Sequence, residues 1–328
     1  MGSEDLLAFV ASTQLRFASG RRTCAWLLLL LLCAGCATMA PVEETRLFSK
    51  AFTAVDGASQ PLLDDHAVAE RRRGQHNAET KAKRNEYEGD CKGIHWAEVG
   101  AQAGFIEGFC LDDAQYFAEI SDPSATRAFR QGIRLLGDYA EVLLTLAEGR
   151  NLDETAAQVQ TLGERISALV SLAPGAGAAG SALTGVLGAL APIIRDAAQA
   201  KNVEELKRLV LSGAPHVKQL IERLQSAAPE VFKTLIGQSA RDVTGPEALD
   251  NAAVAKEHLH RIAAYRIAVS NYVILLDELE RAFEQLVTAF QQPRNAVTLA
   301  SVAQRTAQLT AHAEAWRRVY SLLRTGSE

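Results

Sequence analysis

Apolar residues recur at alternating spacings of three and four through much of the chain after residue 120, and this spacing is typical of one face of an α-helix. Asp122-Pro123 is a helix start, with Asp122 as the cap, and Gly149 is a stop. Asn151 then caps a second helix, so the pair is expected to form a helical hairpin. The two apolar stripes are Phe129, Ile133, Leu136, Ala140, Leu143 and Ala147, and then Val159, Leu162, Ile166 and Leu169.

A longer pair of helices is predicted near the C-terminus. The first is expected to run from Pro246 to Gln292, and Pro293 separates it from the second. A short connection makes such helices antiparallel neighbours. Their stripes are Ile262, Tyr265, Val269, Tyr272, Leu276, Leu279, Phe283, Leu286 and Phe290, and then Val302, Thr306, Leu309, Ala313, Trp316, Tyr320 and Leu323.

Between the two hairpins, the pattern predicts shorter helices that begin at Asn202 and after Pro215 and Pro229. No segment alternates with the period of two that a half-buried strand would show. The sequence therefore predicts an all-α fold, an elongated helical bundle with long antiparallel coiled-coil-like helices.

The region before residue 121 has a different pattern. Residues 37–63 contain Pro41, Gly57 and Pro61 and are expected to form a flexible tether. Residues 64–120 are expected to hold a charged helix and a cysteine pair. Residues 64–90 carry 6 basic and 7 acidic side chains, which favours a solvated helix face over the alternative, a contact with anionic lipid headgroups. Two further regions are predicted. Residues 121–240 hold the first helical hairpin, the glycine-rich apolar segment and the short helices, and residues 241–328 hold the long helical hairpin.

The N-terminus has the layout of a secretory signal peptide. Arg21-Arg22 precedes Trp26 and six leucines, Leu27 to Leu32, and small residues follow. This strongly apolar core is shorter than the roughly 20 residues that a membrane-spanning helix needs.

Ala34-Gly35-Cys36 resembles the lipobox of bacterial lipoproteins, although Cys33 stands where that family usually has leucine. The resemblance implies that residues 1–36 form a signal peptide, cleaved before Cys36, and that Cys36 carries the acyl chains. Several acyl chains give a stable membrane anchor. Ala37, in place of the aspartate that signals inner-membrane retention, implies the outer membrane, facing the periplasm. The alternative is an uncleaved anchor within the uncharged residues 23–42.

The net charge limits the kinds of molecule that the protein is expected to bind, and the cysteines predict a covalent link. Residues 1–36 hold three basic and two acidic side chains, so the rest of the chain has 31 Lys and Arg against 37 Asp and Glu, a net charge of −6. An acidic exported protein has no electrostatic footprint for nucleic acid. Beyond the signal region only Cys91 and Cys110 remain, and in an oxidising compartment they are expected to form a disulfide.

A glycine-rich stretch, Pro174 to Gly180, matches the G-x-G-x-x-G pattern of dinucleotide-binding turns. The pattern needs a preceding strand, but residues 166–173 show helical spacing, so nucleotide binding is not expected. Residues 166–194 carry no charge, and small residues recur there every four positions. The members singled out as a candidate interaction segment, within residues 173–194, are Gly177, Gly180, Ser181, Thr184, Gly185 and Gly188.

Three interpretations of this uncharged segment stay open. It is a loop followed by a buried helix in the bundle core, a membrane-active tip, or a surface on which another helix docks. The membrane-active layout resembles that of the α-helical pore-forming toxins, in which long helices carry an uncharged hairpin between them. The resemblance concerns architecture alone.

No constellation for catalysis, metal or cofactor binding is found in the sequence. Glu257-His258-Leu259-His260 has one E-x-x-H spacing, of which di-iron bundles need two. The function expected is therefore that of a lipid-anchored, non-enzymatic helical scaffold or adaptor, with an envelope protein as partner and with oligomerisation possible through its long helical seams. A membrane-active protein and an unrecognised envelope enzyme are the alternatives.

Overall fold

A computed structural model describes residues 41–83, 91, 94–97, 103–106, 109–172, 177–292 and 295–325 of the chain. Residues 41–328 group into one compact unit. The predicted signal peptide and Cys36 lie outside the described residues, and so do Pro174 and Gly175 of the glycine-rich stretch.

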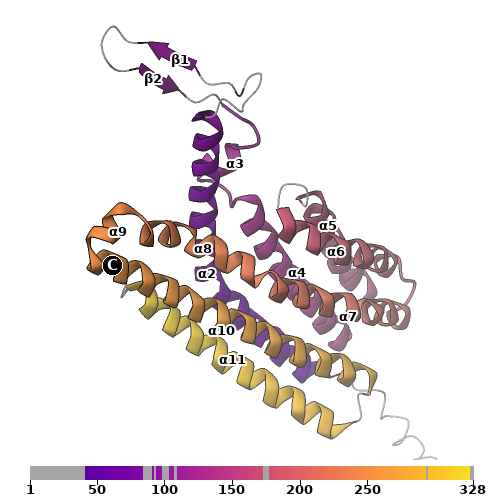
Figure 1. The fold of residues 1–328 in the computed structure, drawn as a ribbon. Coiled ribbons are helices and arrows are strands. Elements are labelled where there is room, and N and C mark those ends of the chain that lie inside the picture. Colours follow the sequence, from indigo (N-terminus) through magenta and orange to yellow (C-terminus); the bar gives the residue numbers. More distant parts are fainter. Residues whose placement is uncertain are drawn as a thin grey trace, which may run out of the picture. The chain divides into compact units, whose positions relative to one another are not determined.

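The described residues are mostly helical, which confirms the predicted all-α helical fold (Figure 1). A short antiparallel hairpin accompanies the helices, with β1 (Ile94–Ala97) paired to β2 (Ala103–Ile106). The helices are α2 (Val42–Lys83), α3 (Ala114–Phe117), α4 (Ser124–Ala147), α5 (Leu152–Leu172), α6 (Gly177–Ala198), α7 (Val203–Ser226), α8 (Ala228–Val243), α9 (Pro246–Asp250), α10 (Ala252–Gln291) and α11 (Ala296–Thr325).

The helix α2 corrects the predicted tether, because residues 42–63 form its first half instead of a flexible linker. It packs against α4, α8, α10 and α11. Pro61 lies inside the helix, where a proline costs about 3 kcal/mol. Burying one large apolar side chain offsets about 1.5–3 kcal/mol. Several apolar side chains are buried in the first half of α2, so together they outweigh the cost of the proline. They are Phe48, Ala51, Phe52, Val55, Ala58, Leu62 and Leu63.

The hairpin of α4 and α5 follows the prediction closely. Gly149 has φ +67°, which is the left-handed conformation that ends many helices at a glycine. Asn151 caps α5 by accepting a hydrogen bond from the Glu154 amide at 2.8 Å. Every member of the two predicted apolar stripes is buried. Local sequence signals are therefore sufficient to place this hairpin.

Two predicted helix boundaries are wrong. Residues 203–226 form one helix, α7, and Pro215 lies inside it instead of starting a new one. The predicted long helix from Pro246 to Gln292 is divided at Asn251, whose side chain accepts a hydrogen bond from the Ala253 amide at 3.0 Å and so caps α10. Both errors arise because proline and asparagine act as boundaries only where the rest of the fold allows it.

The helices α10 and α11 lie side by side and run in opposite directions (Figure 1). The rings of Tyr272 and Trp316 are 6.4 Å apart, and further along α10 the Glu278 carboxylate lies 2.7 Å from Nδ1 of His312. This hairpin is part of the bundle, because α2 packs against both of its helices. The regions expected at 64–120, 121–240 and 241–328 are joined in one compact unit.

A glycine pair tests the correction of the tether. A Cβ atom built on Gly137 of α4 would lie 2.6 Å from a ring carbon of Phe52, whereas one built on Gly185 of α6 would meet nothing within 4 Å. We expect Gly137→Ala to lower the free energy of unfolding by about 1–3 kcal/mol through overpacking. We expect Gly185→Ala to raise it by about 0.5–1 kcal/mol through helix propensity. Denaturant titration followed by circular dichroism measures both. A stabilised Gly137→Ala variant would show that residues 42–63 do not pack on α4.

Candidate functional site: an arginine-lined pocket between α2, α8 and α10

A pocket of about 330 Å³ lies where α2, α8 and α10 meet. That volume is at the lower end of the range of small-molecule sites. On α2 and α10 the lining positions recur at three or four residues and so lie on one face of each helix, whereas α8 contributes most of its residues from Thr234 to Arg241. The lining consists of Asp65, Val68, Ala69, Arg72 and Arg73 of α2, Thr234, Leu235, Gly237, Gln238, Ser239 and Arg241 of α8, and Arg261 and Tyr265 of α10.

Four of these lining residues are arginines, and they come from all three helices. Within the part of the chain that the structure describes, Arg72 and Arg73 make neither a hydrogen bond nor an ion pair. Arg241 donates a hydrogen bond to Oε1 of Gln238 at 2.8 Å, which leaves its charge uncompensated by any described carboxylate. Arg261 pairs with the Glu257 carboxylate at 2.9 Å.

The acidic and apolar parts of the lining complete the chemistry of the pocket. Among the described residues Asp65 is its one carboxylate, and that group accepts a hydrogen bond from the Tyr320 hydroxyl at 2.5 Å. Val68, Leu235 and the ring of Tyr265 supply apolar wall. The lining holds no histidine and no cysteine. Such a set of groups suits the binding of an anion better than proton transfer, for which a second titratable partner is needed.

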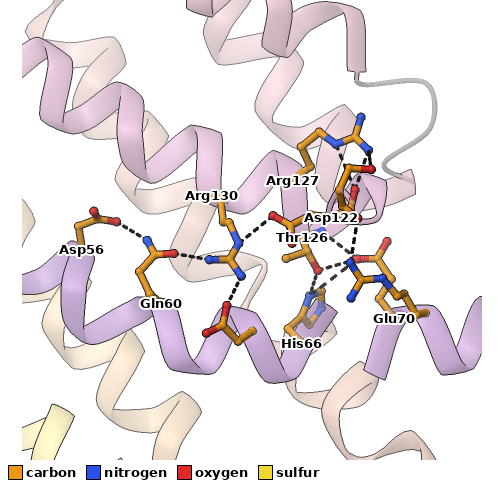
Figure 2. A network of polar contacts seen from close by, with 11 residues as sticks. Asp56, Gln60, His66, Glu70, Asp122, Thr126, Arg127 and Arg130 are labelled. Carbon is orange, nitrogen blue, oxygen red and sulfur yellow. Dashed lines mark hydrogen bonds and ion pairs between the residues drawn. The ribbon is translucent and has the colours of Figure 1, made fainter. Parts of the chain in front are cut away.

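A second polar region lies between α2 and the start of α4 (Figure 2). The Glu70 carboxylate of α2 accepts hydrogen bonds from the backbone amides of Ala125 at 3.0 Å and Thr126 at 2.8 Å. It therefore caps α4 from another helix, and its negative charge sits at the positive end of the α4 dipole. The predicted cap, Asp122, does not serve as one, because Pro123 is the capping residue and has no side-chain hydrogen bond.

Arg130 occupies the other end of this region. It donates hydrogen bonds to Gln60 and Asp64 of α2, and its Nε lies 2.9 Å from Oδ2 of Asp122 (Figure 2). Asp122 thus joins an ion pair in place of a cap. We call residues Gln60, Asp64, His66, Glu70, Asp122, Thr126 and Arg130 the polar seam.

His66 completes the polar seam. Its Nδ1 lies 2.7 Å from Oγ1 of Thr126, whose hydroxyl donates to Glu70 at 2.7 Å. Since that hydroxyl proton is committed to Glu70, Nδ1 of His66 must carry a proton and donate. Burial, followed by the nearby charges of Arg130 and Arg73, lowers the pKa of His66 from 6.5 to about 4. The imidazole is therefore neutral at pH 7, and the polar seam is a structural contact in which one group, the buried Nε of Arg130, has an ion-pair neighbour in Asp122 but no hydrogen bond among the described residues.

The glycine-rich interaction segment is only partly placed. Gly177 begins α6, and the segment's large apolar residues Leu183, Leu187, Leu190 and Ile194 are buried. Gly185 and Gly188 are exposed, and a Cβ on either would meet nothing within 4 Å, so neither brings another described helix close. The side-chain surroundings of Gly180, Ser181 and Thr184 lie outside the described part.

The predicted disulfide between Cys91 and Cys110 is not formed in the described part of the chain. The two cysteines nevertheless lie close to each other, because the Cys110 thiol donates a hydrogen bond to the Cys91 carbonyl at 3.8 Å. In this contact the Cys110 sulfur faces the backbone oxygen of Cys91 and not its sulfur.

The E-x-x-H residues are also placed. Glu257 pairs with Arg261, and Nδ1 of His258 lies 3.9 Å from Oδ2 of Asp242. Across the described ranges, no group of three His, Cys, Asp or Glu side chains is arranged to hold a metal ion.

The sequence analysis missed the pocket. Its only local signal was the run Arg71-Arg72-Arg73, which was interpreted as part of a solvated helix face. Arg72 and Arg73 do line the pocket, but Arg241 and Arg261 lie about 170 and 190 residues further along the chain. No periodicity or spacing rule connects residues at such a distance. Their convergence is a product of how α2, α8 and α10 pack.

A search for membrane-crossing helices found none in the described residues that is long and apolar enough. No family model, curated protein or solved structure matches the chain.

The polar seam predicts a pH dependence of stability. Between pH 6.5 and about 4 the unfolded chain binds a proton on His66 that the folded chain does not, so the free energy of unfolding falls as the pH falls through this window. The expected loss is about 3 kcal/mol, at ~1.4 kcal/mol for each pKa unit. His66→Asn keeps a donor near Thr126 but cannot titrate, so its unfolding free energy should fall less steeply with acid. The measurement is denaturant titration at several pH values, with His216→Asn on α7, outside the polar seam, as a control. Equal slopes in all three proteins would contradict the assignment.

Proposed function

We propose that the protein is a lipid-anchored, non-enzymatic helical scaffold or adaptor of the bacterial cell envelope, held at the outer membrane and facing the periplasm. The Arg21–Cys36 segment, with its resemblance to the lipobox, supports the anchor and the compartment. The pocket supports binding over catalysis, since its one carboxylate is held by Tyr320.

The body would be held close to the bilayer. Only residues 37–41 separate Cys36 from the start of α2 at Val42. A fully extended chain of this length spans at most roughly 20 Å. The longer tether expected from the sequence would have allowed a wide search, whereas a short linker favours a partner that is itself at the membrane surface.

One observation carries the adaptor role. Four large apolar side chains are exposed within a stretch of twelve residues next to α3, namely Phe109, Leu111, Phe117 and Ile120. Single exposed apolar residues are ordinary, but a group of them marks a site of protein interaction. We call these four residues the α3 apolar group, and they are where the partner is proposed to bind.

The membrane-active alternative is less well supported. The large apolar side chains of α6 pack inside the bundle, where α6 contacts α4, α5 and α7. Insertion of this helix into a bilayer would expose that core, at a cost of about 1.5–3 kcal/mol for each large side chain.

The anchor is tested by a matched cysteine pair. We expect Cys36→Ala to abolish the incorporation of labelled palmitate and to release the protein from the membrane fraction, because no acceptor for the acyl chains remains. Cys33→Ala should leave both unchanged, since it alters the neighbouring cysteine without removing the proposed acceptor. Mass spectrometry of the mature N-terminus identifies the acylated residue. Acylation that persists in Cys36→Ala would exclude the anchor.

The adaptor role is tested by crosslinking in cells. A photoreactive residue at Ile120 should yield a discrete protein adduct that disappears when Phe117→Ser is added, because the apolar contact is then weakened. The same probe at exposed Leu249, away from the α3 apolar group, should not yield that adduct. A probe at Gly188 reports on α6. Lipid adducts there, with none to protein at Ile120, would favour the membrane-active alternative.

A further inference from the structure

The arginine-lined pocket concentrates positive charge in a chain that is acidic overall. The chain carries 34 Lys and Arg against 39 Asp and Glu. Against that balance, one pocket brings four guanidinium groups together with a single carboxylate. Arg72, Arg73 and Arg241 are exposed, so water screens most of their mutual repulsion, and a bound anion would offset the rest. Its composition is therefore the first indication of a ligand.

The pocket arginines differ from those that the bundle holds in ion pairs. Arg165 pairs with Asp138 at 2.6 Å and Arg281 with Asp277 at 2.8 Å, whereas other exposed arginines, such as Arg208, have no such partner among the described residues. In the pocket, Arg72, Arg73 and Arg241 have no such pair among the described residues. Three guanidinium groups are thus available to a ligand, and the paired Arg261 lies at the same wall.

The form of the pocket limits the class of ligand. The guanidinium fork matches the oxygens of phosphate in pairs, and several arginines around one group suit a dianion better than a single carboxylate. Hydroxyl groups of Thr234 and Ser239 and the apolar side chains of Val68 and Leu235 line the remainder. An inorganic ion would contact the arginines but not this hydroxyl-bearing and apolar part of the lining.

We propose that the pocket between α2, α8 and α10 binds a phosphate ester, with the phosphate held by Arg72, Arg73 and Arg241 and the organic part against Val68 and Leu235. The ester comes either from a soluble metabolite or from the headgroup of a phospholipid. In both cases guanidinium groups bind phosphate oxygens, although the phosphodiester of a lipid headgroup carries one negative charge where a soluble monoester carries two. The proposal does not depend on the lipid anchor or on the adaptor role.

Gly237 gives a way to close the pocket without touching its charges. It lies in the wall contributed by α8, and a Cβ built on it would meet nothing within 4 Å. Gly237→Leu should therefore fill the space while the helix is retained. Gly188→Leu is its match, because Gly188 is also helical, with nothing within 4 Å, and lies on α6 outside the pocket.

The first arm of the test is calorimetric titration of the full chain, in a neutral detergent, with glycerol 3-phosphate and with uncharged glycerol. We expect saturable binding of the phosphate ester alone. Arg72→Gln with Arg241→Gln should weaken it on the order of 10-fold to 100-fold, as loss of charged hydrogen bonds does, and Gly237→Leu should abolish it. The control pair, Arg208→Gln with Arg305→Gln, removes two exposed arginines from α7 and α11 and should leave the binding unchanged.

The second arm separates the two sources of the ester. The Cys36→Ala chain is floated with vesicles of phosphatidylglycerol or of phosphatidylcholine. Flotation with phosphatidylglycerol that needs Arg72 and Arg241, without binding of glycerol 3-phosphate, identifies a lipid headgroup as ligand. Binding of glycerol 3-phosphate identifies a soluble ester where flotation with phosphatidylglycerol does not depend on Arg72 and Arg241, and dependence in both arms shows that the pocket accepts either source. The proposal is overturned if neither probe binds, or if the control pair weakens binding as much as the pocket pair does.

Discussion

The capping of α4 by Glu70 is the contact on which the arrangement of this bundle depends. A helix start leaves amide groups without partners, and burying them unpaired costs free energy. Here both oxygens of one carboxylate from α2 satisfy two of them, while Gln115 of the α3 segment accepts from the Ser124 amide at 3.0 Å. Because these bonds are directional, they set where α2 lies along α4 as well as holding the two together.

The position of α2 in turn determines where its other faces meet α8 and α10. His66 and Glu70 face the start of α4, whereas Val68 and Arg72, each two residues further on, face α8 and α10. Residues two apart on a helix point to different sides. The same stretch of α2 therefore carries the polar seam and the wall of the arginine pocket on adjoining faces, and Arg73 of the pocket is near enough to lower the pKa of His66. A change that shifted α2 relative to α4 would also rearrange the pocket.

The two proposals concern different regions of the molecule. The anchor and the α3 apolar group lead to a protein that works by position, whereas the arginine pocket leads to recognition of a phosphate ester. They are compatible, because a membrane-held adaptor could respond to such a ligand through α2, which contacts both α3 and the pocket helices.

Much of the fold could be predicted from the sequence because it is local. The stripe from Phe129 to Ala147, the stop at Gly149 and the cap at Asn151 act within a few residues of one another, and all three were predicted correctly. The stripes of α10 and α11 likewise became buried surfaces from Val269 to Phe290 and from Val302 to Tyr320. Periodicity of three and four suffices to identify such elements.

The tertiary structure decided what local signals could not. Pro61 and Pro215 were interpreted as breaks, but packing along α2 and α7 outweighs the cost of each proline. Asp122 was expected to cap α4, but Glu70, more than fifty residues earlier, does so. The pocket arginines come from three helices far apart in the chain. Each outcome depends on which helices pack against each other. The free energy of that packing depends on residues far apart in the chain, so no short stretch of sequence determines it.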